Sequence, residues 1–283
     1  MFSRRWIINY LLIVLIIVFT YVGNRFDVKT GFQQQADITG LEAADIESVE
    51  IKTADASLSL RRGSNGWQLE APIRWPANNI NVERMLDIVN SQSDSRLDAA
   101  EIDLASLGLD FPKAMLRLND TRVLFGSTNN IGGRRYTMID STVFLLPDNH
   151  LPFISQGLTG MVDRRLVPRS LGLARLKLPE LEVSRDAGGD WVSTTSDYTS
   201  QQAMQLAENW QGLAATRVNA FNPASTPRQK IEAVLEQGER LEFFLMSIEP
   251  EIVIANPRIG LQYHFGAEFY YQLIALRRDD NPA

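Results

Sequence analysis

A glycine-rich turn that leads into a single tryptophan occurs twice in this chain. "GSNGWQLEAP" spans residues 63–72, and a weaker copy, "AGGDWVSTTS", spans residues 187–196. In both copies the turn residues tolerate positive φ, and the polar segment after the tryptophan is typical of a returning strand. A chain of 283 residues has room for two ordinary domains. The repeat therefore predicts two similar modules in tandem.

The predicted elements around each tryptophan follow the same order. Alternating apolar and polar residues predict strands at 46–53 and 57–62 in the first copy, and at 173–185 in the second. An amphipathic helix follows in each copy, and Asn79 or Asn81 is the predicted cap of the first one. The apolar stripes of the two helices comprise Val82, Met85, Leu86 and Val89, and then Ala203, Leu206, Ala207, Trp210, Leu213 and Ala214.

A strand-rich half follows each predicted helix, over residues 114–147 and 230–265, and each copy ends on a short apolar segment. Helices among antiparallel hairpins indicate the α+β class, with two tandem modules of antiparallel sheet and packed helices. The expected organisation is an anchor at 1–25, a linker at 26–44, a first module at 45–160 and a second, diverged module at 161–283.

The N-terminus predicts an uncleaved transmembrane helix over residues 6–22. Arg4 and Arg5 precede a run that is free of charge from Trp6 to Asn24 and long enough to cross a bilayer. A cleaved signal peptide is the alternative, but no small-x-small cleavage site follows. The basic residues before the run favour a cytoplasmic N-terminus. We therefore expect a single-pass protein of the bacterial inner membrane, with the bulk of the chain in the periplasm.

Composition argues against several classes of function. The net charge of −6 and the pI of about 5.1 are not those of a nucleic-acid-binding protein. The chain has no cysteine, and its two histidines, His150 and His264, are far apart with no metal-binding spacing. Phosphate-binding glycine motifs are also missing from the sequence. We expect no cofactor, no metal and no catalytic residue.

Three tryptophans carry different expectations. Trp67 and Trp191 follow tight turns, where a large ring can cover the open end of a sheet, so core packing is the favoured interpretation. The alternative is an exposed pair that stacks on sugars or binds a peptide. Trp75 lies between two prolines in a predicted loop, and we interpret it as a surface aromatic residue that could dock a partner.

The densest positive charge lies where the first module meets the second. Arg164, Arg165 and Arg169 fall within "DRRLVPRSL". One interpretation is pairing with nearby acidic residues across the junction. The other is a docking patch for an acidic partner.

Several motifs of the first module resemble a bacterial family, the domain of unknown function 4340. They are "IESVEI", "GWQLEAP", "ANNINVERML", "DLASLGLDFPKAMLRL" and the hairpin "YTMIDSTVFLL". The resemblance covers roughly residues 45 to 215, and "LGLDFP" (residues 107–112) is its most specific part. The second copy lacks this turn. The resemblance implies an envelope protein held at the membrane, whose relatives accompany auxiliary components of gliding-motility-type ABC transporters; it implies no activity.

These observations lead to an expected function of protein binding in the envelope. The expected partners are the lipid bilayer, through residues 6–22, and an envelope protein such as an ABC transporter. Two alternatives stay open. A periplasmic carbohydrate hydrolase would need a carboxylate pair, for which residues 98–103, Glu249 and Glu251 are candidates. A solute-binding component would need a deep pocket between the modules.

Overall fold

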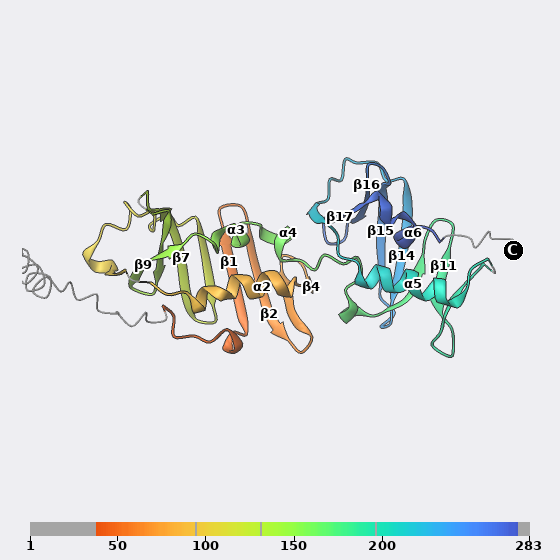
Figure 1. Cartoon of the computed structure of the whole chain (residues 1–283), viewed down its shortest axis with the longest axis horizontal. Coiled ribbons are helices and arrows are strands. Elements are labelled where there is room, and N and C mark those ends of the chain that lie inside the picture. Colours follow the sequence, from red (N-terminus) through yellow and green to blue (C-terminus); the bar gives the residue numbers. More distant parts are fainter. Residues whose placement is uncertain (1–37, 94, 131, 196, 277–283) are drawn as a thin grey trace, which may run out of the picture.

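The computed structural model describes residues 38–93, 95–130, 132–195 and 197–276. Two antiparallel sheets follow one another along the long axis of the molecule (Figure 1). The predicted transmembrane helix at residues 6–22 lies outside the described residues. Within those residues, no helix combines the length and the apolar character that crossing a bilayer requires.

The first sheet contains nine strands in the order β4-β3-β2-β1-β6-β7-β8-β9-β5. Every pair of neighbours is antiparallel. The strands are β1 (Ser48–Thr53), β2 (Ser57–Gly63), β3 (Gly66–Ala71), β4 (Trp75–Pro76), β5 (Arg96–Asp98), β6 (Ala114–Leu118), β7 (Thr121–Thr128), β8 (Arg134–Ile139) and β9 (Thr142–Pro147).

The second sheet contains eight strands in the order β12-β11-β10-β14-β15-β16-β17-β13, and its pairs are also antiparallel. The strands are β10 (Leu173–Lys177), β11 (Glu182–Arg185), β12 (Trp191–Ser193), β13 (Arg217–Ala220), β14 (Gln229–Leu235), β15 (Arg240–Ser247), β16 (Glu251–Asn256) and β17 (Leu261–Gly266).

The two sheets have the same topology. Matching β1 with β10 and continuing along the chain reproduces the strand order, with β4 as the extra strand at the edge of the first sheet. In each sheet the first three strands form a meander, and the strand after the long helix crosses to the far edge. The repeated turn of the sequence therefore marks the same place, the hairpin before β3 and before β12, in two units of equal design.

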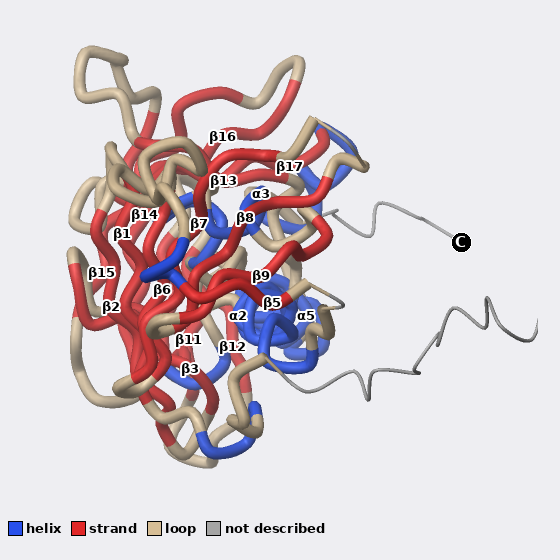
Figure 2. The backbone as a smooth tube through the Cα atoms, turned by 90° about the vertical axis from the view of Figure 1, so that its left-hand side faces the viewer, coloured by secondary structure: helices blue, strands red, loops and turns tan. Residues whose placement is uncertain are grey.

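The helices are short except for one long helix in each unit. The α-helices are α2 (Asn79–Leu86), α3 (Leu151–Ile154), α4 (Gly157–Met161), α5 (Ser200–Gly212) and α6 (Tyr270–Leu273). The 3₁₀ turns are η1 (Ala43–Asp45), η2 (Asp87–Asn90), η3 (Ala99–Glu101), η4 (Arg169–Leu171) and η5 (Ala267–Phe269). Helices α2 and α5 lie on the same side of the molecule, each beside its own sheet (Figure 2).

Both predicted apolar stripes pack inward, with small corrections. Val82, Met85 and Leu86 are buried in α2, and Val89 follows in η2. The cap of α2 is Asn78, because its side chain accepts the Asn81 backbone N–H at 3.3 Å. The α5 stripe ends at Trp210, since the helix stops at Gly212 before Leu213 and Ala214. A Thr199–Gln202 capping box begins this helix.

Trp67 and Trp191 are both core residues, as predicted. They are only 3% and 6% exposed. An arginine lies directly across the hairpin from each: Arg62 pairs in register with Trp67, and Arg185 pairs with Trp191. The guanidinium carbons lie 4.8 and 5.1 Å from the indole ring centroids, within the range of a cation–π contact. The two units therefore share an arginine-on-tryptophan pair as well as a topology.

Most of the buried apolar side chains of both units belong to one connected cluster. Ile38, which lies within the expected linker, is also part of it, so packed structure extends into that segment. The cluster continues from one unit to the other through Met161, Val162, Leu166 and Val167, all fully buried.

Candidate functional site

The connector, residues 162–167, bonds to both units. On the first-unit side, Asp163 N–H donates to the Pro76 carbonyl at 2.9 Å. On the second-unit side, Ala215 N–H donates to the Arg164 carbonyl at 2.8 Å. Short antiparallel bridges accompany these bonds at both ends. The connector therefore joins the units as ordered backbone.

Arg164 uses its side chain inside the fold. Its Nε donates to the Ala215 carbonyl at 2.7 Å, and one terminal nitrogen donates to the Ala215 and Thr216 carbonyls. The pairing with acidic residues that the sequence suggested is wrong for Arg164, because backbone carbonyls take that place. The Arg164 guanidinium thus forms hydrogen bonds that join the connector to the second unit.

Arg165 pairs with an acid of the connector itself, so the predicted pairing across the junction stays a prediction for this residue. Its Nε lies 3.4 Å from Asp163 Oδ1, and its backbone N–H donates to the same oxygen at 3.0 Å. Burial raises the pKa of the Asp163 carboxyl, and the Arg165 N–H and charge oppose this rise. Asp163 is therefore a partly buried acid at the junction between the units.

Arg169 is exposed and lines a cavity of about 510 Å³ on the second unit. Asp190, Trp191, Glu208 and Glu236 share its walls. In the part of the chain that the structure describes, Arg169 makes no ion pair. A docking role for Arg169 therefore stays a prediction; Arg185 lines the same cavity, so its walls carry charges of both signs.

Trp75 is 6% exposed, so its interpretation as a surface aromatic residue is wrong. The segment is not a free loop: Trp75 belongs to β4 and pairs with Leu69. Its indole N–H and the Tyr263 hydroxyl of the second unit are both buried without a hydrogen bond of normal geometry. Burial and the Asp163 charge raise the pKa of the Tyr263 hydroxyl, and the nearby Trp75 N–H opposes this.

Trp75 also lines a cavity between the units. Its volume is about 470 Å³, with Gln68, Arg74 and Trp75 on one wall and Leu171, Glu239 and Arg258 on the other. Arg258 and Glu239 form an ion pair at the rim. The junction thus combines an ordered connector, buried polar groups and a cavity within the range of small-molecule sites.

His264 has charged and polar neighbours, although it stood alone in the sequence. Its Nδ1 lies 2.8 Å from Glu251 Oε1, and Gln262 Nε2 lies 3.1 Å from its Nε2. The His264 hydrogen bond lowers the pKa of Glu251, and Arg217 contributes. Glu251 lies beside His264 because Val253, two residues later on the same face, pairs with it in register.

His150 occupies a different place, in the first unit. Its Nε2 lies 3.1 Å from the Ser91 hydroxyl, and the residue is 6% exposed. Burial lowers the pKa of this imidazole. Among the described residues no group of three His, Cys, Asp or Glu side chains is arranged to hold a metal ion.

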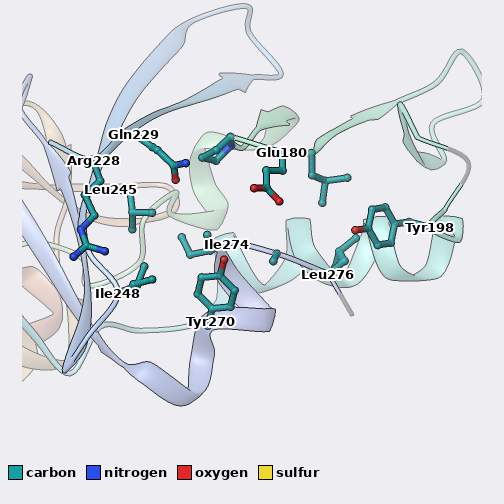
Figure 3. A pocket seen from close by; sticks show the side chains of 12 residues that line it. Glu180, Tyr198, Arg228, Gln229, Leu245, Ile248, Tyr270, Ile274 and Leu276 are labelled. Carbon is teal, nitrogen blue, oxygen red and sulfur yellow. The ribbon is translucent and has the colours of Figure 1, made fainter. Parts of the chain in front are cut away.

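A third cavity, of about 310 Å³, lies at one end of the second sheet (Figure 3). Five separate segments contribute to it: the β10–β11 turn, Tyr198 just before α5, the start of β14, the end of β15 with Ile248, and the stretch from α6 to Leu276. We call it the terminal cavity. Arg228 and Tyr270 lie on its walls, and no pattern in the sequence singled them out.

Comparison with family models places residues 67–243 in the domain of unknown function DUF4340. The chain belongs to this family. The DUF4340 match begins at Trp67 in β3 of the first unit and ends in β15 of the second, so it includes both tryptophans, the second glycine turn and the whole connector. No curated protein and no solved structure matches the chain.

Within this DUF4340 domain, the turn at residues 107–112 holds an exposed aromatic ring. Phe111 is 92% exposed, whereas Leu109 in the same turn is 3% exposed. The Leu107 carbonyl accepts the Ser127 N–H at 2.8 Å, and a Cβ on Gly126 would lie 2.4 Å from that carbonyl. A turn packed this closely against β7 displays Phe111 from a fixed position.

Proposed function

We propose that this DUF4340 protein is a membrane-tethered accessory module that binds a protein partner in the bacterial envelope. The apolar run at residues 6–22 supports the tether, and the ordered connector supports a scaffold that presents two units in a set arrangement. The preferred partner is a component of an ABC-type transport complex. Binding, and not catalysis, is the role that we assign to the two units.

The observation that carries the proposal is the exposed ring of Phe111. A phenyl group in water forgoes its hydrophobic stabilisation, which reaches about 1.5–3 kcal/mol when such a side chain is fully buried. Aromatic residues are enriched in protein interfaces, where they fill pockets on the partner. Since Gly126 lets the turn pack closely on β7, Phe111 is held ready for such a pocket.

A photo-crosslinking amino acid at position 111 in living cells tests the proposal. We expect one dominant crosslinked envelope protein, to be identified by mass spectrometry. Ile80, which is 63% exposed on helix α2, is the matched control position. A transporter subunit captured at 111 and not at 80 would support the accessory role. Equal, diffuse labelling from both positions would contradict partner binding through Phe111.

Solute binding is the second candidate, and the cavity between the units favours it. Because Trp75 lines this cavity, a solute bound there should shift the NMR signal of its indole N–H. Titration with envelope sugars and amino acids would test this. An unchanged Trp75 signal throughout, with all other tryptophan signals assigned, would remove this candidate.

A further inference from the structure

The terminal cavity has the features of a small-molecule site in a part of the protein remote in sequence from Phe111. Its volume of about 310 Å³ falls at the lower end of the roughly 300–1,000 Å³ typical of ligand sites. It is bounded by segments from residue 179 to residue 276, so only the folded second unit assembles it. A small ligand would fit it better than a peptide segment.

Apolar side chains from several segments line part of the cavity. Leu181, Leu245 and Ile274 are at most 7% exposed, and Ile248 and Leu276 complete the lining. These side chains come from the β10–β11 turn, from β15 and from the C-terminal stretch after α6. These side chains give one part of the cavity an apolar surface that a hydrocarbon body would cover.

The rest of the cavity is lined by the polar or charged side chains of Glu180, Tyr198, Arg228, Gln229 and Tyr270. Figure 3 shows Arg228 beside Ile248 at one end, Glu180 on another wall, and the Tyr270 ring with its hydroxyl toward the middle. The Arg228 backbone is fixed, since its N–H donates to the Leu245 carbonyl at 2.8 Å. Within the described residues, the Arg228 guanidinium makes no ion pair or hydrogen bond, so it can bind an anion without breaking an internal contact.

The charges restrict the ligand further. Arg228 attracts a carboxylate, which a guanidinium can bind through two hydrogen bonds. Glu180 on the other wall repels a second negative charge. The combination disfavours a dianion and leaves a single negative head with an apolar body.

We propose that the terminal cavity binds a small monoanionic amphiphile, with its carboxylate on Arg228 and its hydrocarbon body against Leu181, Leu245 and Ile274. Such a ligand is chemically a short or medium-chain fatty acid. This site is independent of partner binding through Phe111, and either proposal can fail alone.

Hexanoate is the probe, and saturation-transfer NMR on the full chain in lipid nanodiscs is the measurement. Empty nanodiscs give the background from the lipid. We expect hexanoate to bind the wild-type protein. Hexanol has no carboxylate and adipate carries two, so we expect each of them to bind at least about tenfold more weakly than hexanoate. Wild type without hexanoate binding above background, or adipate as tight as hexanoate, would overturn the proposal.

Three variants test whether Arg228 binds the carboxylate of the ligand. Arg228→Gln should raise the hexanoate dissociation constant by about tenfold or more, because it removes a charged hydrogen-bonding partner. Arg240→Gln, at an exposed β15 position outside the cavity, should leave binding unchanged. Glu180→Gln should bring adipate close to hexanoate. Arg228→Gln binding as well as wild type, or Arg240→Gln losing as much, would contradict the assignment.

Discussion

Arg62 and Arg185 each cover the indole ring opposite them, but the Arg62 side chain also donates hydrogen bonds to two backbone carbonyls outside its hairpin. Its Nε donates to the Ile46 carbonyl at 2.8 Å and a terminal nitrogen donates to the Ala43 carbonyl at 2.7 Å. Among the described residues, the one hydrogen bond that Arg185 donates from its side chain goes to the Gly189 carbonyl of its own hairpin, and its Nε lies 3.8 Å from Glu236. The arginine-on-tryptophan pair is therefore hydrogen-bonded to other segments of the first unit, whereas in the second unit its hydrogen bond stays within its own hairpin.

Replacing each arginine with methionine should separate the contribution of the cation–π contact from that of the hydrogen bonds to backbone carbonyls. Arg185→Met removes mainly the cation–π contact and should lower the free energy of unfolding by about 0.5–1 kcal/mol. Arg62→Met should cost about 1–2 kcal/mol more, because it also leaves two carbonyls without their donors. Urea denaturation followed by tryptophan fluorescence measures both. Equal losses in the two variants would contradict this account.

Asp163 predicts a pH-dependent stability. Because its pKa is raised in the folded protein, ionisation of the carboxyl costs stability as pH rises through that pKa, and below the pKa of the unfolded chain (about 3.9) the cost vanishes. Asp163→Asn should therefore be more stable than wild type at pH 7, with the difference shrinking toward pH 4.

Thermal unfolding at several pH values checks the Asp163 prediction. Asp55→Asn, at an exposed position, is the control and should show no such pH-dependent gain. Asp163→Asn that is less stable than wild type at neutral pH would show that the Arg165 ion pair outweighs the cost of burial.

Among the elements, α5 organises the second unit. Its buried residues face the sheet, and Trp210 packs edge-on against Phe243 with ring centroids 5.4 Å apart. The Trp210 indole N–H also donates to the Leu273 carbonyl at 2.8 Å, inside the protein. This bond attaches the C-terminal helix α6, and with it one wall of the terminal cavity, to α5.

Trp210→Phe tests that attachment. The ring packing is largely kept, but the Leu273 carbonyl loses its buried donor, which should lower stability by about 1–3 kcal/mol. Hydrogen exchange should accelerate at residues 270–276 more than in the α5 backbone. Trp191→Phe is the matched control, because the indole N–H of Trp191 makes no hydrogen bond within the described residues. Unchanged exchange at 270–276 in Trp210→Phe would contradict the role of this bond.

At the scale of the whole molecule, the connector decides how the two units are held. Backbone bonds join it to Pro76 on one side and to Ala215 on the other, and its apolar side chains are fully buried. Arg164 adds side-chain bonds to the second-unit end. The units therefore behave as one scaffold only while this segment stays ordered.

Arg164→Met should loosen that scaffold. Spin labels at Ser59 in the first unit and Ser184 in the second should report a broader distance distribution, because the Ala215 and Thr216 carbonyls lose their shared donor. Arg169→Met, on the exposed turn that follows, should leave the distribution as in wild type. A distribution that stays equally narrow in Arg164→Met would show that the backbone bonds suffice.

The sequence by itself was enough for the α+β class, the two repeated units, the buried tryptophan pair and the family. The first three rest on local signals: period-two alternation, helical spacing, or a glycine turn beside a large ring. The family rests on the resemblance of specific motifs, above all residues 107–112. The sequence analysis did not predict the edge strands β5 and β13, because segments of three and four residues are too short to show a periodic pattern.

Only the tertiary structure decided the sites. Trp75 is buried because a two-residue strand brings it to the sheet edge at the junction, and Arg164 turns inward because the connector places carbonyls of residues 215 and 216 beside it. Glu251 lies beside His264 because of strand register, and Arg228 and Tyr270 line the same cavity because the C-terminal stretch returns to the second sheet. Contacts between distant segments depend on register and crossing, which local patterns do not encode.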